Sequence, residues 1–127
     1  MTASILLASQ SPRRRELLAQ LGVGFEPIRV EVDECWDGRE PPAEHVQRLA
    51  IAKAQAGWAA SQDADPRPVL AADTVVVIDD DVFGKPRDRN AGLQMLAKLS
   101  GRSHYVYSAV ALRCVTGCPS RVSATRV

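Results

Sequence analysis

The sequence predicts an α/β fold in which residues 1–127 form one domain, with a mixed β-sheet and flanking helices. Strand-like apolar runs alternate along the chain with stretches of helical periodicity. The second half adds strand pairs joined by short turns, which predicts antiparallel hairpins beside the parallel strands. A length of 127 residues, 46% of them hydrophobic and 24% charged, suits a single hydrophobic core.

The first predicted strand is the apolar run Ile5–Ala8. A helix over Arg13–Leu21 should follow, because Ser11 can be its N-cap and Pro12 its first helical residue. Its apolar residues fall at helical spacing and are expected to be buried: Leu17, Leu18 and Leu21. Loose alternation then predicts a second strand over Phe25–Val32.

After a polar loop over residues 33–42, a second helix is predicted over Ala43–Ala60. Its buried stripe is expected to consist of Val46, Leu49, Ala50, Ala54 and Gly57. A strand over Val69–Asp79, a turn and a short return strand, Val82-Phe83, come next.

The rest of the chain predicts a third helix over Asn90–Leu99, a long strand over His104–Val115 and a turn at Thr116–Pro119. Another strand begins at Arg121 and is still strand-like at Val127. We therefore expect this chain to be the front part of a longer domain.

Composition excludes several functional classes. Sixteen Lys and Arg against fifteen Asp and Glu give a net charge of +1, so bulk charge does not favour nucleic-acid binding. The longest apolar run is too short to cross a membrane, and no basic segment precedes the apolar N-terminus as in a secretory signal. An odd cysteine count (Cys35, Cys114 and Cys118) favours reduced thiols in a cytoplasm over disulfides or a cysteine metal site.

Arg13-Arg14-Arg15 falls in the first turn of the first predicted helix, where cations oppose the helix dipole. A bound anion, held by backbone N–H groups, serine hydroxyls and guanidinium groups, would remove this conflict. The alternative is a solvated basic turn. The Ser-rich loop between strand and helix favours the phosphate site.

Lys53 and Asp73 are the two charged residues that interrupt apolar patterns. Lys53 lies on the apolar stripe of the second helix and either extends along the surface or points into a cleft. Asp73 lies inside the run Val69–Ile78, where an unpaired carboxylate is costly to bury. We expect the strand to break at Asp73-Thr74 and to direct the carboxylate into a cleft. The alternative is an aspartate that accepts backbone hydrogen bonds.

Two further patterns are weaker. Gly84-Lys85-Pro86 fixes the backbone and can direct Lys85 to a definite point, and Glu31-Val32-Asp33-Glu34 offers carboxylates that suit a hard cation. His45 and His104 have no partner at a telling spacing and are interpreted as surface or sheet residues.

Taken together, these motifs resemble the Maf family of nucleoside triphosphate pyrophosphatases, which are linked to septum formation. The resemblance is carried, in family order, by Leu7-Ala8-Ser9-Gln10-Ser11-Pro12-Arg13-Arg14, Val32-Asp33-Glu34, Arg48-Leu49-Ala50 with Lys53-Ala54, Ala72-Asp73-Thr74-Val75-Val76 and Gly84-Lys85-Pro86. It implies a mixed sheet around a deep cleft, similar to the inosine triphosphate pyrophosphatases, and a homodimer.

The resemblance also implies a reaction: hydrolysis of a nucleoside triphosphate to the monophosphate and pyrophosphate with Mg²⁺ or Mn²⁺. Arg13 and Thr74 match the branch that takes dTTP and UTP, and modified pyrimidine nucleotides are plausible further substrates. By position, Asp73 would be the proton acceptor and a metal-linked carboxylate, and Glu34 would help to hold the metal. The phosphates would be held by Ser9, Ser11, Arg13, Arg14, Lys53 and Lys85.

The sequence departs from the family pattern at its end. The family's later Gly-Glu-Pro, Lys-Ala-Gly and Ile-Gln-Gly elements do not occur before Val127. We therefore expect weak or absent activity from this chain alone. The alternatives are a non-catalytic nucleotide- or phosphate-binding module, an inactive truncated fragment and a structural septum-associated protein. A pure anion binder, however, would avoid carboxylates such as Glu34 and Asp73.

Overall fold

The computed structural model describes residues 5–9, 11–33, 38–61, 67–78, 81–83, 89–90, 93–94, 97 and 104–126. The elements are β1 (Ile5–Leu7), α1 (Pro12–Gln20), β2 (Phe25–Pro27), α2 (Pro42–Ser61), β3 (Val69–Ile78), β4 (Asp81–Phe83), β5 (Tyr105–Arg113) and β6 (Ser120–Arg126). Most of the helix predicted over Asn90–Leu99 lies outside the described residues.

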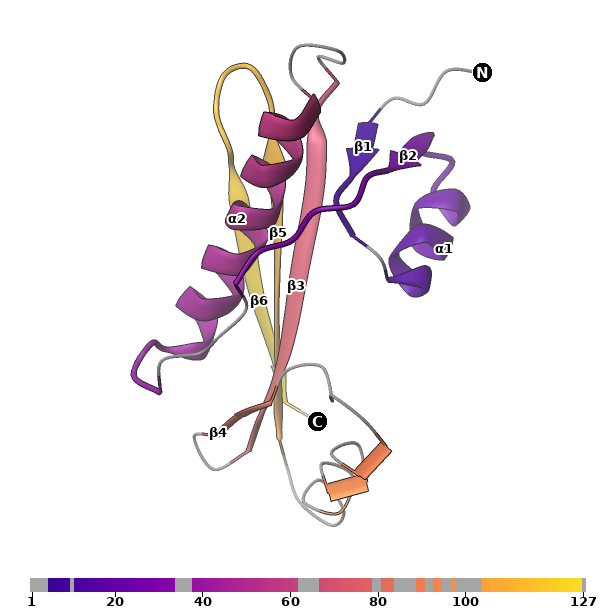
Figure 1. Ribbon diagram of the computed structural model, residues 1–127. Helices are drawn as coiled ribbons and strands as arrows, with labels where there is room; N and C mark the ends of the chain where they lie inside the picture. The colour runs from indigo at the N-terminus through magenta and orange to yellow at the C-terminus, as the bar shows by residue number, and fades with distance from the viewer. Residues whose placement is uncertain are drawn as a thin grey trace.

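The strands form one mixed sheet in the order β2-β1-β3-β5-β6, with β4 paired to β3. β1 runs parallel to β2 and β3, whereas β4, β5 and β6 run antiparallel to their neighbours. Figure 1 shows β3 as the long central strand, with α1, β1 and β2 on one side and α2 lying across β5 and β6. The predicted mixed α/β fold class is confirmed.

One edge of β3 is shared by two short strands. β1 pairs with residues 69–70 at its start and β4 pairs with residues 76–78 at its end. The opposite edge is paired to β5 continuously over residues 69–77. In the described part of the chain no strand pairs with residues 71–75 on the shared edge. The middle of β3, which carries Asp73, therefore has one open edge.

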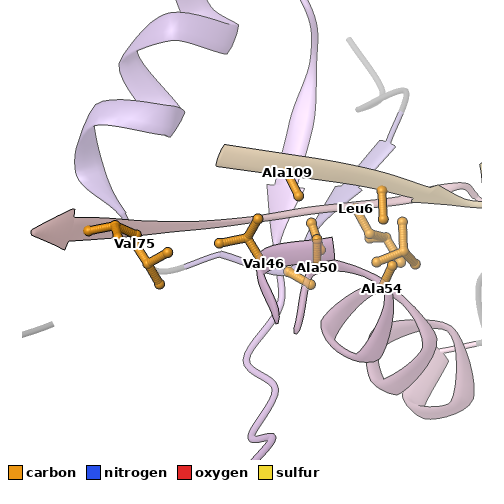
Figure 2. Packing of buried hydrophobic residues seen from close by; sticks show 11 residues of the cluster. Leu6, Val46, Ala50, Ala54, Val75 and Ala109 are labelled. Atoms are coloured by element: carbon orange, nitrogen blue, oxygen red, sulfur yellow. The ribbon is translucent and has the colours of Figure 1, made fainter. Parts of the chain in front are cut away.

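The core lies between α2 and the sheet. The predicted stripe of α2 is confirmed, because Val46, Leu49, Ala50, Ala54 and Gly57 are all buried. Figure 2 shows Val46, Ala50 and Ala54 of α2 facing Leu6, Val75 and Ala109 of the sheet. The small residues let the helix approach closely, since a Cβ at Gly57 would lie 2.8 Å from Val69 Cγ1.

The expected burial of α1 is wrong. Every residue of this helix, all of them described, is at least partly exposed, with Leu17 at 46%. Leu21, the C-cap residue, is 75% exposed. Periodicity identifies an apolar stripe, but it does not establish that another element packs against that stripe. Ser11 is the N-cap residue, although its hydroxyl makes no capping hydrogen bond.

The predicted strand Phe25–Val32 is also too long. β2 ends at Pro27 because its partner β1 ends at Leu7, which lies opposite Pro27 in the register. Beyond that pair, Ile28 N donates to Leu7 O and the chain leaves the sheet.

The expectation that His45 is a surface or sheet residue is wrong. It lies buried on α2, and its Nδ1 is 3.0 Å from Glu40 Oε1. Arg48 joins the same cluster, because its Nε lies 2.9 Å from Glu40 Oε2. The Arg48 hydrogen bond lowers the pKa of the Glu40 carboxyl, and the His45 contact acts in the same direction. Among the described residues, no helix is long and apolar enough to cross a membrane.

Candidate functional site

Asp73 lies in the middle of β3, at the centre of the open edge. The predicted break at Asp73-Thr74 is wrong, because β5 pairs with both residues through Ala109 and Ser108 without interruption. Side chains alternate along a strand, so Asp73 shares the face of Ala71 and Val75, which packs against α2. Its exposed fraction is only 8%. The carboxylate is therefore held in the apolar layer and needs a charged or hydrogen-bonding partner there.

Lys53 supplies that partner. Its Nζ donates a hydrogen bond to Asp73 Oδ1 over 3.1 Å, and the two side chains are 18% and 10% exposed. Lys53 extends from the sheet-facing side of α2, where Ala50 and Ala54 are buried on either side of it. Of the two possibilities left by the sequence, the structure shows the inward one: the ammonium points to Asp73.

Arg14 connects α1 to the open edge of β3. Its Nη1 donates to Ser9 Oγ over 3.3 Å, and its Nη2 donates to Thr74 Oγ1 over 3.0 Å. Burial lowers the pKa of the Arg14 guanidinium, and the negative charge of Asp73 acts in the opposite direction. Arginine nevertheless stays protonated in proteins, so Arg14 places a fixed positive charge near Asp73.

Thr74 and Ser108 form the other side of the site. Thr74 follows Asp73 and therefore points to the opposite face of the sheet. Its Oγ1 lies 3.1 Å from Ser108 Oγ on β5, and the two residues are opposite each other in the register. Sequence reasoning missed Ser108, because a serine in a half-exposed strand carries no signal until the register places it beside Thr74.

The loop before α1 brings the predicted serines next to Arg14. Ser9 is buried, with 8% exposure, and its Oγ accepts a hydrogen bond from Ser11 N over 3.3 Å. Arg13 lies exposed in the first turn of α1, beside Arg14. This helix start therefore combines exposed backbone N–H groups with guanidinium groups, as an anion site requires.

Two predicted site residues, Glu34 and Lys85, lie outside the described residues. The structure thus forms two groups at neighbouring residues of β3: Lys53 of α2 contacts Asp73, and Arg14 of α1 contacts Ser9 and Thr74. A separate shallow cavity of about 410 Å³ opens beside α1, and its described lining is Arg15, Pro27, Ile28 and Arg29.

Asp73 also bears on metal binding. The described residues hold no group of three or more His, Cys, Asp and Glu side chains that could bind an ion by themselves. Mg²⁺, however, is usually held by one or two carboxylates together with substrate phosphates and waters. A single buried carboxylate beside cationic side chains fits that kind of shared site.

Comparison of the sequence with known proteins identifies its family. The profile described as Maf-like protein matches residues 4–127 of this chain. The chain belongs to the Maf-like family.

Curated relatives of this Maf-like chain carry the name dTTP/UTP pyrophosphatase. The one from Pseudoalteromonas atlantica is 48% identical over 124 residues, covering 97% of this chain and 65% of that protein. The Escherichia coli UTI89 protein is 53% identical over 109 residues, covering 86% of this chain and 54% of that protein. The Maf-like chain therefore spans less than two thirds of the length of these relatives.

Solved structures support the fold. The Staphylococcus aureus Ham1 protein matches with a TM-score of 0.58 at 16% identity, covering 97% of this chain and 69% of that one. A dITP/XTP pyrophosphatase from Mycobacterium abscessus matches with a TM-score of 0.50 at 21% identity, covering 96% and 69%. At these identities the similarity shows a shared architecture alone.

Proposed function

We propose that this Maf-like chain takes part in the hydrolysis of dTTP and UTP to the nucleoside monophosphate and pyrophosphate. The observation that carries the proposal is the buried carboxylate of Asp73 paired with Lys53, next to Thr74, which holds the Arg14 guanidinium. The names of the relatives supply the substrate class. An anion-binding surface alone has no use for a buried carboxylate, which would repel the ligand.

The triphosphate would bind at the start of α1. Arg14 is held by Ser9 and Thr74, so its guanidinium is fixed in place before a ligand arrives. The backbone N–H groups of the first turn add donors for phosphate oxygens. The residues assigned to this task are Ser9, Ser11, Arg13, Arg14, Lys53 and Lys85, and Thr74 holds Arg14 next to the substrate.

Asp73 would act as the general base. Its carboxylate takes a proton from a water molecule as the water oxygen attacks the α-phosphorus. The bond from the α-phosphorus to the bridging oxygen breaks, and pyrophosphate leaves with that electron pair. Lys53 fixes the orientation of the carboxylate through Oδ1, and the cationic side chains stabilise charge on the leaving group.

A divalent cation, Mg²⁺ or Mn²⁺, would be held by Asp73 together with Glu34. Bound there, it would neutralise phosphate charge and act as a Lewis acid.

Membership of the family supports two further proposals, on substrate preference and on oligomeric state. Arg13 and Thr74 support a preference for pyrimidine nucleotides, including pseudouridine and 5-methyl forms. We also propose a homodimer, which sedimentation of the purified chain would test.

Pyrophosphate release tests the proposed reaction. The chain is incubated with a panel of nucleoside triphosphates and Mg²⁺ or Mn²⁺, and dTTP and UTP should give the highest rates. Asp73→Asn should reduce turnover at least about 100-fold, as expected for loss of a general base. Glu44→Gln is the matched control, because Glu44 is an exposed carboxylate on the first turn of α2.

The possible results separate the enzyme from a binding module. Near-normal turnover by Asp73→Asn would remove Asp73 from its role. Tight nucleotide binding by the wild-type chain without pyrophosphate release would support the non-catalytic alternative.

A further inference from the structure

Ser108 on β5 ends a chain of hydrogen bonds that starts at the Ser-rich loop. Arg14 joins Ser9 Oγ to Thr74 Oγ1, and Thr74 Oγ1 lies 3.1 Å from Ser108 Oγ. The chain thus links the β1–α1 loop, α1, β3 and β5.

The direction of the two Arg14 bonds is fixed by their chemistry. Arginine has only N–H donors, so Thr74 Oγ1 must accept from Arg14 Nη2. The bond between Thr74 and Ser108 can run in either direction, because a threonine hydroxyl that accepts from Arg14 keeps one proton to donate and one lone pair to accept. In either direction, the contact with Ser108 restricts the rotation of the Thr74 hydroxyl and leaves a lone pair for Arg14.

We propose that Ser108 is a positioning residue, which acts through Thr74 to hold the Arg14 guanidinium in the orientation that grips phosphate. This inference rests on the proposed function, because it assumes that Arg14 binds phosphate oxygens.

The place of Ser108 in the sheet suits that role. β5 is an inner strand, and Ser108 pairs with Thr74 on one side and with Ser123 of β6 on the other. Its backbone is therefore held from both sides. Arg14, in contrast, sits on α1, a helix whose residues are all partly exposed. The inner strand β5 can therefore fix the orientation of the Arg14 guanidinium, which the exposed helix α1 does not fix by itself.

Five variants test the proposal in the full chain. Ser108→Ala removes the hydroxyl, and Ser108→Thr keeps it. Ser123→Ala is the matched control, because Ser123 is an exposed serine directly opposite Ser108 on β6. Thr74→Val, alone and combined with Ser108→Ala, removes the group through which Ser108 acts.

Two measurements are needed: binding of inorganic tripolyphosphate by calorimetry, and KM and kcat with dTTP. Ser108→Ala should weaken tripolyphosphate binding and raise KM by about three- to tenfold, the range for one hydrogen bond, with kcat changed less than about twofold. Ser108→Thr and Ser123→Ala should both behave as wild type. In the Thr74→Val background, adding Ser108→Ala should have no further effect.

Three results would overturn the proposal: unchanged binding by Ser108→Ala, equal weakening by Ser108→Thr, or a full Ser108→Ala effect in the Thr74→Val background. Failure of the wild-type chain to bind tripolyphosphate would overturn it as well. If binding depends on Ser108 as expected but dTTP and UTP yield no pyrophosphate, the positioning role stands and the proposed function is wrong.

Discussion

Replacing Lys53 by methionine isolates the charge of the buried pair. Methionine keeps an unbranched apolar side chain on α2 and removes only the ammonium, so the packing beside Ala50 and Ala54 is largely preserved. The Asp73 carboxylate then stays in the apolar layer without the Lys53 ammonium, although the positive charge of Arg14 still acts on it. We expect Lys53→Met to lower the free energy of unfolding.

The size of the effect follows from the geometry. At the 3.1 Å separation of Lys53 Nζ and Asp73 Oδ1, an effective dielectric constant of about 20 gives an attraction of about 5 kcal/mol. Removal from water costs part of this, and neither side chain is fully buried, at 18% and 10% exposure. The expected loss is therefore about 2–3 kcal/mol, between the values for surface pairs and fully buried pairs.

A double-mutant cycle separates the pair from its surroundings. Asp73→Asn alone should cost only about 1 kcal/mol, because an amide oxygen still accepts from the Lys53 ammonium. Combining Lys53→Met with Asp73→Asn should cost less than the sum of the single changes by at least about 1 kcal/mol. Urea unfolding followed by far-UV circular dichroism measures all four proteins. A Lys53→Met loss below about 0.5 kcal/mol, or simple additivity, would refute a strong Lys53–Asp73 interaction.

Two further predictions concern the helix that carries Lys53. Gly57→Ala should lower the free energy of unfolding, measured in urea, by about 1 kcal/mol. Overpacking of the new Cβ against Val69 Cγ1 at 2.8 Å outweighs the better helix propensity of alanine, and a stabilised variant would contradict this. Glu40→Gln tests the pH dependence of stability. The hydrogen bond from Arg48 lowers the pKa of the Glu40 carboxyl in the folded protein. The carboxylate therefore stabilises the fold above its unfolded pKa, and this contribution is lost as the pH falls through the folded pKa. Glu40→Gln should melt at a lower temperature than wild type at neutral pH, and its melting temperature should fall less as the pH is lowered. Melting temperatures that change with pH in parallel with those of wild type would exclude this role of the Glu40 carboxylate.

The parts of the fold that sequence predicted are those where local pattern and tertiary packing agree. The stripe of α2 repeats at helical spacing and packs against the sheet, so the expected buried residues are the observed ones. On α1 the same kind of stripe stays exposed, since no pattern within a helix reports what lies outside it. β2 was overestimated because the end of a strand is decided by its partner, here at Leu7.

For the candidate site, sequence indicated the charged residues but not their connections. Asp73 and Lys53 stood out because each interrupts an apolar pattern, and their distance in space depends on how α2 lies over β3. The expected break at Asp73 did not account for β5, which pairs through that point. Ser108 interrupts nothing, so only the register could identify it.

The arginine that would grip a phosphate also fastens its own helix. Since each side chain of α1 keeps some contact with solvent, apolar packing contributes little to docking, and Arg14 ties the helix to Ser9 and Thr74. An arriving anion would draw on the same guanidinium that tethers α1. Ligand affinity and the order of this helix would therefore be thermodynamically linked through Arg14.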